Sequence, residues 1–137
     1  MLDGKTLVLP DRLGNNRLDT FENLLVHREI GLLFLIPGHG NTLRISGKGQ
    51  IVLDTRLQKQ TSINDRHPTA LLVVTAEEVF LHCAKCVTRS KIWQPEFWPD
   101  RVGVATLAQA MVTHGQLKDS LPEMQAIIDR DADERLY

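Results

Sequence analysis

The order of apolar and polar positions divides the chain into a first part with strand patterns and a second part with helical patterns. Runs of aliphatic and β-branched residues, or strict alternation, predict strands over 6–9, 30–36, 43–53, 69–75 and 77–83. Apolar residues at helical spacing predict helices over 18–26 and within 104–137, and polar stretches predict short helices over 55–65 and 84–93. The pattern therefore predicts an α+β fold in which neighbouring strands are mostly antiparallel.

Four of the predicted strands carry further information. Strand 30–36 is apolar on both faces, which predicts a central strand that is covered on both sides. The interruption Gly47-Lys48-Gly49 predicts a glycine bulge that bends strand 43–53 and lets the sheet curl toward a barrel. The segment between 69–75 and 77–83 is too short for a crossover, so these two strands are predicted to form an antiparallel hairpin.

Length and composition predict a globular chain with a single domain. The 137 residues are 42% apolar and carry a net charge of −1, and this near-neutral balance is not typical of nucleic-acid binding. We expect one domain over 1–137, with a barrel core over 1–103 and a peripheral helical tail over 104–137. The longest apolar run is too short to span a membrane and the N-terminus lacks a signal-peptide pattern, so we expect a cytoplasmic protein.

The turn between the first strand and the first helix is rich in basic and amide side chains. It contains Arg12, Asn15, Asn16 and Arg17, immediately before a helix whose first turn includes Asp19. Guanidinium groups beside the free N–H groups of a helix start can bind a phosphate. Alternatively, Asn16 caps the helix, Asp19 favours its first turn, and the arginines are solvated. The local pattern leaves both interpretations open.

Two further motifs carry alternative interpretations. Cys83-Ala84-Lys85-Cys86 has the spacing of redox pairs and of half a zinc site, but a second such pair is absent from the sequence. We interpret these residues as ordinary, partly buried cysteines that stay reduced in the cytoplasm. Trp93 and Trp98 can stack on a planar ligand or close the edge of a core. The sequence contains no nucleophile elbow, no Walker A motif and no Rossmann glycine fingerprint.

Four separated motifs resemble the pyridoxamine 5'-phosphate oxidase-like family, in particular its branch of FMN-dependent oxidoreductases. They are Leu9-Pro10-Asp11-Arg12-x-Gly14-Asn15-x-Arg17-x-Asp19, Gly31-Leu32-Leu33-Phe34, Thr42-Leu43-Arg44-Ile45-x-Gly47 and His82-Cys83-x-Lys85-x-x-x-Arg89-Ser90-x-x-Trp93. The resemblance extends from about Leu2 to Trp98. It implies a split β-barrel that forms a homodimer, with FMN between the subunits and a small-molecule substrate of unknown identity.

The resemblance also implies a set of cofactor-binding residues. The phosphate would be held by residues of the basic turn, which are Arg12, Asn15, Asn16 and Arg17. Thr42 and Arg44 would lie along the flavin, and Lys85, Arg89 and Ser90 would lie near the cofactor or the substrate opening. No catalytic side chain and no metal ligand is assigned, and neither nucleic acid nor a membrane is expected as a partner.

Members of this family normally begin with a helix and two barrel strands, whereas this chain begins after them. We therefore expect an incomplete barrel and a sequence that lacks the N-terminal part of the family fold. An alternative function follows, which is a non-catalytic dimerising or ligand-binding split-barrel fragment that has lost tight flavin binding. Some split barrels bind haem or deazaflavin, so the identity of the cofactor also stays open.

Overall fold

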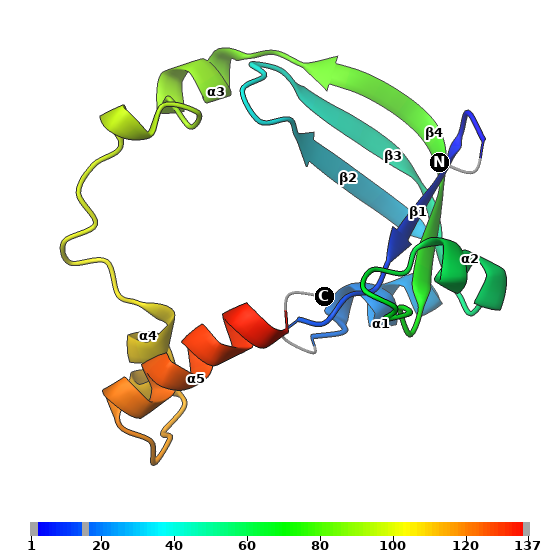
Figure 1. The fold of residues 1–137 in the computed structure, drawn as a ribbon. Helices are drawn as coiled ribbons and strands as arrows, with labels where there is room; N and C mark the ends of the chain where they lie inside the picture. Colours follow the sequence, from blue (N-terminus) through cyan, green and yellow to red (C-terminus); the bar gives the residue numbers. More distant parts are fainter. Residues whose placement is uncertain (1–2, 15–16, 136–137) are drawn as a thin grey trace. The chain divides into compact units, whose positions relative to one another are not determined.

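The computed structural model describes residues 3–14 and 17–135, which fall into two compact units (Figure 1). One unit comprises Met1–Arg12 and Asn16–Trp98, and the other comprises Leu13–Asn15 and Pro99–Tyr137. The first unit contains the sheet and three α-helices, and the second contains two α-helices. No helix of the described residues combines the length and apolarity that crossing a membrane would require.

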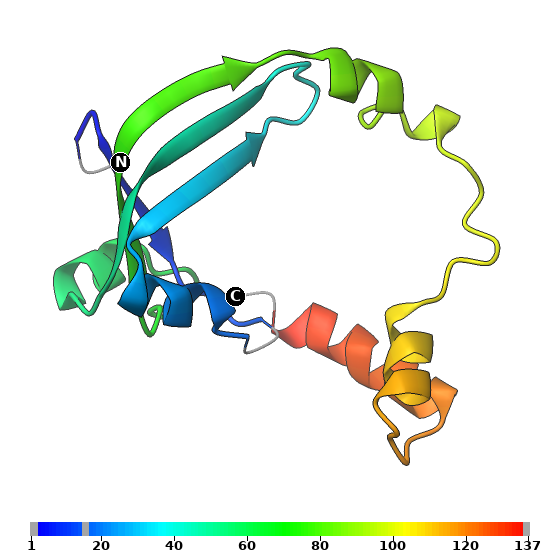
Figure 2. The ribbon, with the colours of Figure 1, turned by 180° about the vertical axis from the view of Figure 1, so that it is seen from behind.

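The first unit is built on one antiparallel sheet with the strand order β1-β4-β3-β2. Its strands are β1 (Thr6–Pro10), β2 (Glu29–Leu35), β3 (Thr42–Val52) and β4 (Leu71–His82). The long strands β2, β3 and β4 curve side by side, as Figures 1 and 2 show from opposite sides. The α+β class with an antiparallel sheet is confirmed, and the sheet of the described residues is open, as an incomplete barrel requires.

A register shift lies in the middle of this sheet, at the glycine interruption. Ser46 pairs with Glu78 and Gly47 pairs with Ala76, so Glu77 is an extra residue in β4. Gly47 is required there, because a Cβ atom at this position would lie 2.1 Å from the backbone oxygen of Thr75. The predicted glycine bulge is confirmed, and the extra residue is contributed by the partner strand.

The core of the first unit lies between one face of the sheet and helix α1 (Asp19–Val26). Leu24 of α1 packs with Leu72 and Val74 of β4, and the surrounding apolar side chains are Leu7, Leu9, Phe21, Ile30 and Leu32. Gly49 allows this approach, since a Cβ atom there would lie 3.1 Å from Leu24 Cδ2. We call this side of the sheet the core face.

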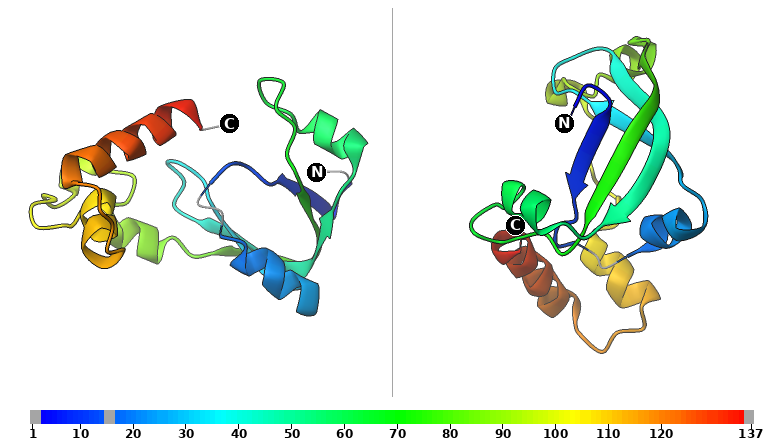
Figure 3. Two further views of the ribbon diagram at one scale, coloured as in Figure 1. Left: turned by 90° about the horizontal axis from the view of Figure 1, so that it is seen from below. Right: turned by 90° about the vertical axis from the view of Figure 1, so that its right-hand side faces the viewer.

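Three short elements complete the first unit. Helix α2 (Thr55–Gln60) is capped by Asp54, whose Oδ1 accepts a hydrogen bond of 2.9 Å from the Leu57 N–H. It lies on the opposite side of the sheet from α1 (Figure 3). Helix α3 (Lys85–Ser90) and the 3-10 helix η1 (Pro95–Phe97) follow β4. The predicted short helices are confirmed, although α2 ends before residue 65.

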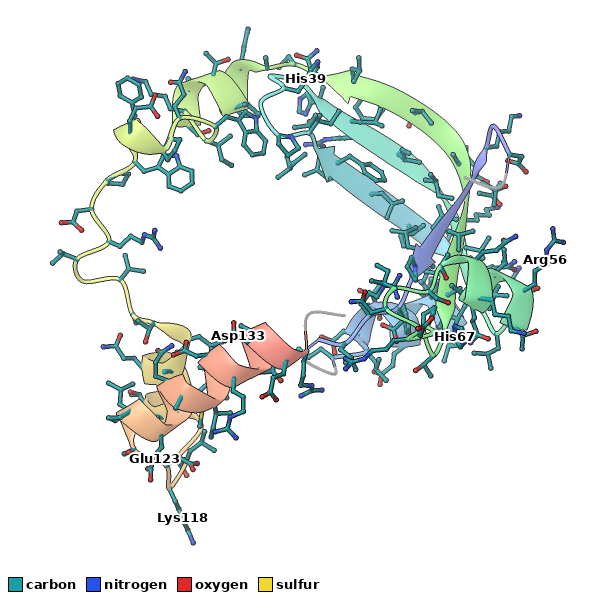
Figure 4. The ribbon with its side chains drawn as sticks, in the orientation of Figure 1. His39, Arg56, His67, Lys118, Glu123 and Asp133 are labelled. Carbon is teal, nitrogen blue, oxygen red and sulfur yellow. The ribbon has the colours of Figure 1, made fainter. Side chains whose placement is uncertain are left out.

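The second unit is a pair of capped helices, α4 (Leu107–His114) and α5 (Leu121–Glu134). Both begin with a capping box, formed by Thr106 with Gln109 and by Ser120 with Glu123. Hydrogen bonds from the Ser120 hydroxyl and N–H lower the pKa of Glu123. Glu123 lies at the start of α5, and Lys118 lies in the loop before it (Figure 4). The predicted helical tail is confirmed.

Strand β2 differs from the prediction, because it is an edge strand and not a central one. Exposed and half-buried side chains alternate along it, and Leu33 and Leu35 are 56% and 50% exposed. The apolar residues on both faces had suggested cover from the same chain. Within the described residues of this unit, the core helix α1 covers only the other face, so the prediction was wrong.

The predicted hairpin over 69–83 is also wrong, because these residues form the single strand β4. Thr75 and the two glutamates that follow resemble a turn in composition. However, Ala76 N–H donates a 2.8 Å hydrogen bond to the Lys5 carbonyl, and residues on both sides of Glu77 pair with β3. The bulge absorbs the charged residue, and the strand continues past it.

Candidate functional site

The sheet has two halves with different surroundings. We call the part around β1 and residues 47–52 and 71–76 the proximal half, and the part formed by 31–35, 42–46 and 78–82 the distal half. The proximal half holds the core. In the distal half, β4 is exposed over residues 77–81 and β2 over alternate residues. The distal half is therefore the surface of this unit on which a ligand or partner can act.

A row of three residues crosses the distal half on the side opposite the core face. Leu33, Arg44 and Phe80 are paired in register across β2, β3 and β4, so their side chains share one face. All three are exposed, Leu33 to 56% and Phe80 to 42%. With the neighbouring Leu35, they form what we call the Arg44 face. A cation between apolar side chains suits a flat aromatic ligand that carries negative charge.

The core face of the distal half is also apolar, and the part of it on β4 is exposed. Val79 and Leu81 lie on it and are 56% and 61% exposed. Helix α1 has eight residues and is therefore about 12 Å long, whereas the twelve residues of β4 span about 40 Å. The helix cannot cover the whole strand. Apolar surface on both faces of an open sheet is typical of a region that a partner covers.

A cleft lies beside the distal half, between the β2–β3 turn and α3. It has a volume of about 330 Å³ and is lined by Gly38, Gly40, Val87, Thr88, Lys91, Trp93 and Gln94. The Trp93 indole N–H donates a 2.8 Å hydrogen bond to the His39 carbonyl, which ties the two walls together. His39 is labelled in Figure 4, next to α3. Trp93 thus serves to position this turn.

Five of the residues predicted to bind a cofactor lie at the distal end. Arg44 is on the Arg44 face, whereas Thr42 is only 5% exposed at the start of the same strand. Lys85, Arg89 and Ser90 are exposed on α3, which begins three residues after His82, the register partner of Thr42. The structure therefore brings these five residues to one end of the sheet.

The predicted phosphate-binding turn lies at the proximal end. Arg12 follows β1, and its guanidinium donates a hydrogen bond to the Thr61 carbonyl. Arg17 is paired with Asp19 at 3.8 Å, and Asn15 and Asn16 lie outside the described residues. Pro10 pairs with Leu71, nine residues before Phe80, so about 30 Å of strand separates this turn from the Arg44 face. One subunit does not bring the two groups together.

The residues of the distal half fit FMN, a cofactor with a flat ring system and a phosphate. Leu33 and Phe80 offer apolar contact to a ring, and the Arg44 guanidinium offers a positive charge. Within the described residues no group of three or more histidine, cysteine or acidic side chains could hold a metal ion. Cys83 and Cys86 are free and exposed, so the prediction that they are partly buried was wrong.

Comparisons with solved structures include a likeness at low sequence identity. No protein-family model matches the chain, and no curated protein does. A tagged form of HupZ from Group A Streptococcus is similar in structure, with a TM-score of 0.48 and 18% sequence identity. The similarity covers 58% of this chain and 64% of the HupZ chain. What the chain does is therefore inferred from its own residues.

Sequence reasoning found Arg44 but missed the apolar residues on either side of it. Leu33 and Leu35 were interpreted as parts of a covered central strand, and Phe80 as part of a hairpin, whereas all three are exposed. A signal was present, because Arg44 lies mid-strand and its neighbours across the sheet must share its face. An exposed arginine in a strand therefore indicates that apolar residues in the same row are exposed as well.

Proposed function

We propose that this chain is one subunit of a homodimeric, FMN-dependent oxidoreductase of the pyridoxamine 5'-phosphate oxidase-like family, acting on a small-molecule substrate. The row Leu33–Arg44–Phe80 is the observation that supports this function best. It combines apolar contact area with one fixed positive charge on an open sheet surface. Few surfaces of the described residues offer both properties to a flat anionic ligand.

The homodimer is part of the proposal because one subunit holds only half of the expected site. The basic turn with Arg12 and Arg17 and the Arg44 face are separated by about 30 Å of β4. A second subunit can bring its own basic turn to the Arg44 face of the first. The same contact would cover Leu33, Leu35 and Phe80, which a monomer leaves in water.

Each group of residues then has a distinct role. Bound FMN would supply the redox chemistry, which amino-acid side chains do not provide. Leu33 and Phe80 would contact the ring system and exclude water from one side of it. Arg44 would stabilise negative charge that develops on the ring, and the arginines of the basic turn would bind the phosphate. Lys85, Arg89 and Ser90 would line the substrate opening.

The visible absorption spectrum of the purified protein tests the proposal first, before and after incubation with FMN and removal of free cofactor. We expect a retained flavin band at about one FMN per subunit. A Soret band in place of the flavin band would assign haem as the cofactor instead. Neither band, together with no binding of added FMN, would overturn the flavin function.

Riboflavin lacks the phosphate. Comparing the binding of FMN with that of riboflavin therefore distinguishes residues that contact the ring from residues that bind the phosphate. Arg44→Ala should weaken the binding of both flavins about tenfold, because FMN and riboflavin have the same ring system. Arg17→Ala should weaken the binding of FMN by a similar factor and leave the binding of riboflavin unchanged. Arg56→Ala is the matched control, since Arg56 is exposed on α2 and points away from the sheet in Figure 4. Equal effects of all three variants would contradict the assigned roles.

A second function is favoured by two specific contacts. Arg12 already donates to the Thr61 carbonyl, and Thr42 is only 5% exposed, so two predicted cofactor contacts are engaged or covered within the subunit. These contacts favour a non-catalytic dimerising or ligand-binding module. A stable dimer that neither retains nor binds any flavin would support this function over the oxidoreductase.

A further inference from the structure

We propose that Cys83 and Cys86 form a redox-active dithiol that exchanges with anionic low-molecular-weight disulfides of the glutathione type. The dithiol chemistry does not depend on the flavin function, although Lys85 and Arg89 belong to both proposals. Both cysteines are free and exposed, so both sulfur atoms are accessible to a reagent in water. Cys83 directly follows β4 at the distal end of the sheet, and Cys86 is the second residue of α3.

The backbone of this turn already has the geometry that a disulfide needs. Ala84 has φ −70° and ψ −7°, and Lys85 is the first residue of α3, so both residues between the cysteines are right-handed helical. Positions i and i+3 of such a turn have Cα atoms about 5 Å apart. Disulfides join Cα atoms roughly 4.4–6.8 Å apart. The bond can therefore form without rearrangement of the chain.

The turn is also held in place by its neighbour. A Cβ atom added to Gly40 would lie 3.1 Å from the Cβ of Ala84, so the cysteine turn packs closely against the β2–β3 turn. The Trp93 hydrogen bond to the His39 carbonyl ties the segment that follows α3 to the same β2–β3 turn. Preorganisation of this kind favours closure of an intramolecular disulfide over two separate mixed disulfides.

The charge around the pair selects the class of partner. From Val79 to Pro95 the chain contains no acidic residue, whereas it contains Lys85, Arg89 and Lys91. These cations would attract a disulfide that carries carboxylates, such as glutathione disulfide, and repel a cationic one such as cystamine. The partner is therefore an anionic disulfide.

The reaction proceeds by two exchanges. One cysteine thiolate attacks a sulfur of glutathione disulfide, forming a mixed disulfide and releasing one glutathione thiolate. The second cysteine thiolate then attacks the protein sulfur of the mixed disulfide and releases the second glutathione. Two electrons pass from the protein dithiol to glutathione disulfide, and the two thiol protons end on the two glutathione thiols. The protein retains the Cys83–Cys86 disulfide.

Mass spectrometry of the full chain after incubation with glutathione disulfide tests the first half of the proposal. We expect the mass to fall by two hydrogens, with no retained glutathione and no free thiol. Cys83→Ser and Cys86→Ser should each retain one glutathione, and both variants should fold because the side chains are exposed. Glutathione on both cysteines of the unaltered chain, or disulfides between two chains, would overturn the proposal.

The rate of oxidation tests the second part of the proposal, which is the preference for an anionic disulfide. Glutathione disulfide should oxidise the pair faster than cystamine, and added salt should reduce the difference. Lys85→Gln should slow oxidation by glutathione disulfide at least about twofold and should not slow oxidation by cystamine. Equal rates for the two disulfides would overturn the preference, and the spectrum of bound flavin would be unaffected by either result.

Discussion

Strand β4 runs through two environments. Its buried residues stabilise the fold, whereas its exposed residues are available to contact a ligand or a partner. Leu72 and Leu81 lie on the same core face of this strand, yet Leu72 is 7% exposed and Leu81 is 61% exposed. Helix α1 is long enough to cover only the first of them. Both positions carry a leucine, so the residue type indicates that a surface tends to be covered but not what covers it.

The largest effect should come from truncation of a leucine in the buried half. Leu72→Ala removes a side chain from the core with Leu24 and Val74, and we expect a loss of about 2–5 kcal/mol in the free energy of unfolding. Leu81→Ala is the matched control and should change the stability of the monomer by less than about 0.5 kcal/mol. Urea denaturation measures both. Similar losses of unfolding free energy in the two variants would contradict the distinction between a buried and an exposed half.

The boundary between the halves should be sensitive to a single methyl group. Gly47→Ala places a Cβ atom 2.1 Å from the Thr75 carbonyl oxygen, so the bulge must shift, and we expect a loss of about 1–3 kcal/mol. Gly31→Ala is the control, because a Cβ atom at Gly31 has no neighbour within 4 Å. Thermal unfolding compares the two. A Gly47→Ala protein as stable as Gly31→Ala would argue against the bulge.

A third prediction concerns the exposed half and the proposed homodimer. Phe80→Ala should weaken association of the subunits by more than about 1 kcal/mol, roughly a factor of five or more in the dissociation constant. Unfolding of the monomer should hardly change, because Phe80 is 42% exposed. Sedimentation equilibrium measures the association. An unchanged dissociation constant would place the subunit contact elsewhere.

The smallest effect is a pH-dependent one at the entry to β1. Asp3 accepts hydrogen bonds from the Lys5 and Thr6 N–H groups and the Thr6 hydroxyl, and these lower its pKa. The lowered pKa means that the stabilisation is present above the ordinary value of about 3.9 and is lost as the pH falls through the folded-state pKa. The Thr6 amide shift, followed by NMR, should titrate below that ordinary value. Asp3→Asn should abolish this titration.

Local chemistry was sufficient to predict several elements correctly from the sequence. The start of α2 was predicted at residue 55, and Asp54 before it accepts a hydrogen bond from the Leu57 N–H three residues later, so the sequence nearby contains the whole signal. The Gly47 bulge was also predictable, because glycine permits a close approach of two backbones. These features depend on few residues beyond their own neighbourhood.

The features that were missed depend on pairing between distant segments. The edge position of β2 and the continuity of β4 follow from the strand order, which an apolar run does not encode. The candidate site was predicted in part for the same reason. Arg44 was recognised by its own chemistry, whereas Leu33 and Phe80 acquire significance only through the register that places them beside it.

The extra residue at the bulge, Glu77, determines on which face of the sheet each later side chain of β4 lies. In a ladder without a bulge, Glu77 would take the place of Glu78 opposite Ser46, and Glu78 would face the buried Ile45. Phe80 would then move to the opposite side of the sheet from Arg44. Deletion of Glu77, in contrast, would retain every distal pair as it is now. This position is therefore one where the chain can become one residue shorter while both faces of the sheet keep their chemistry.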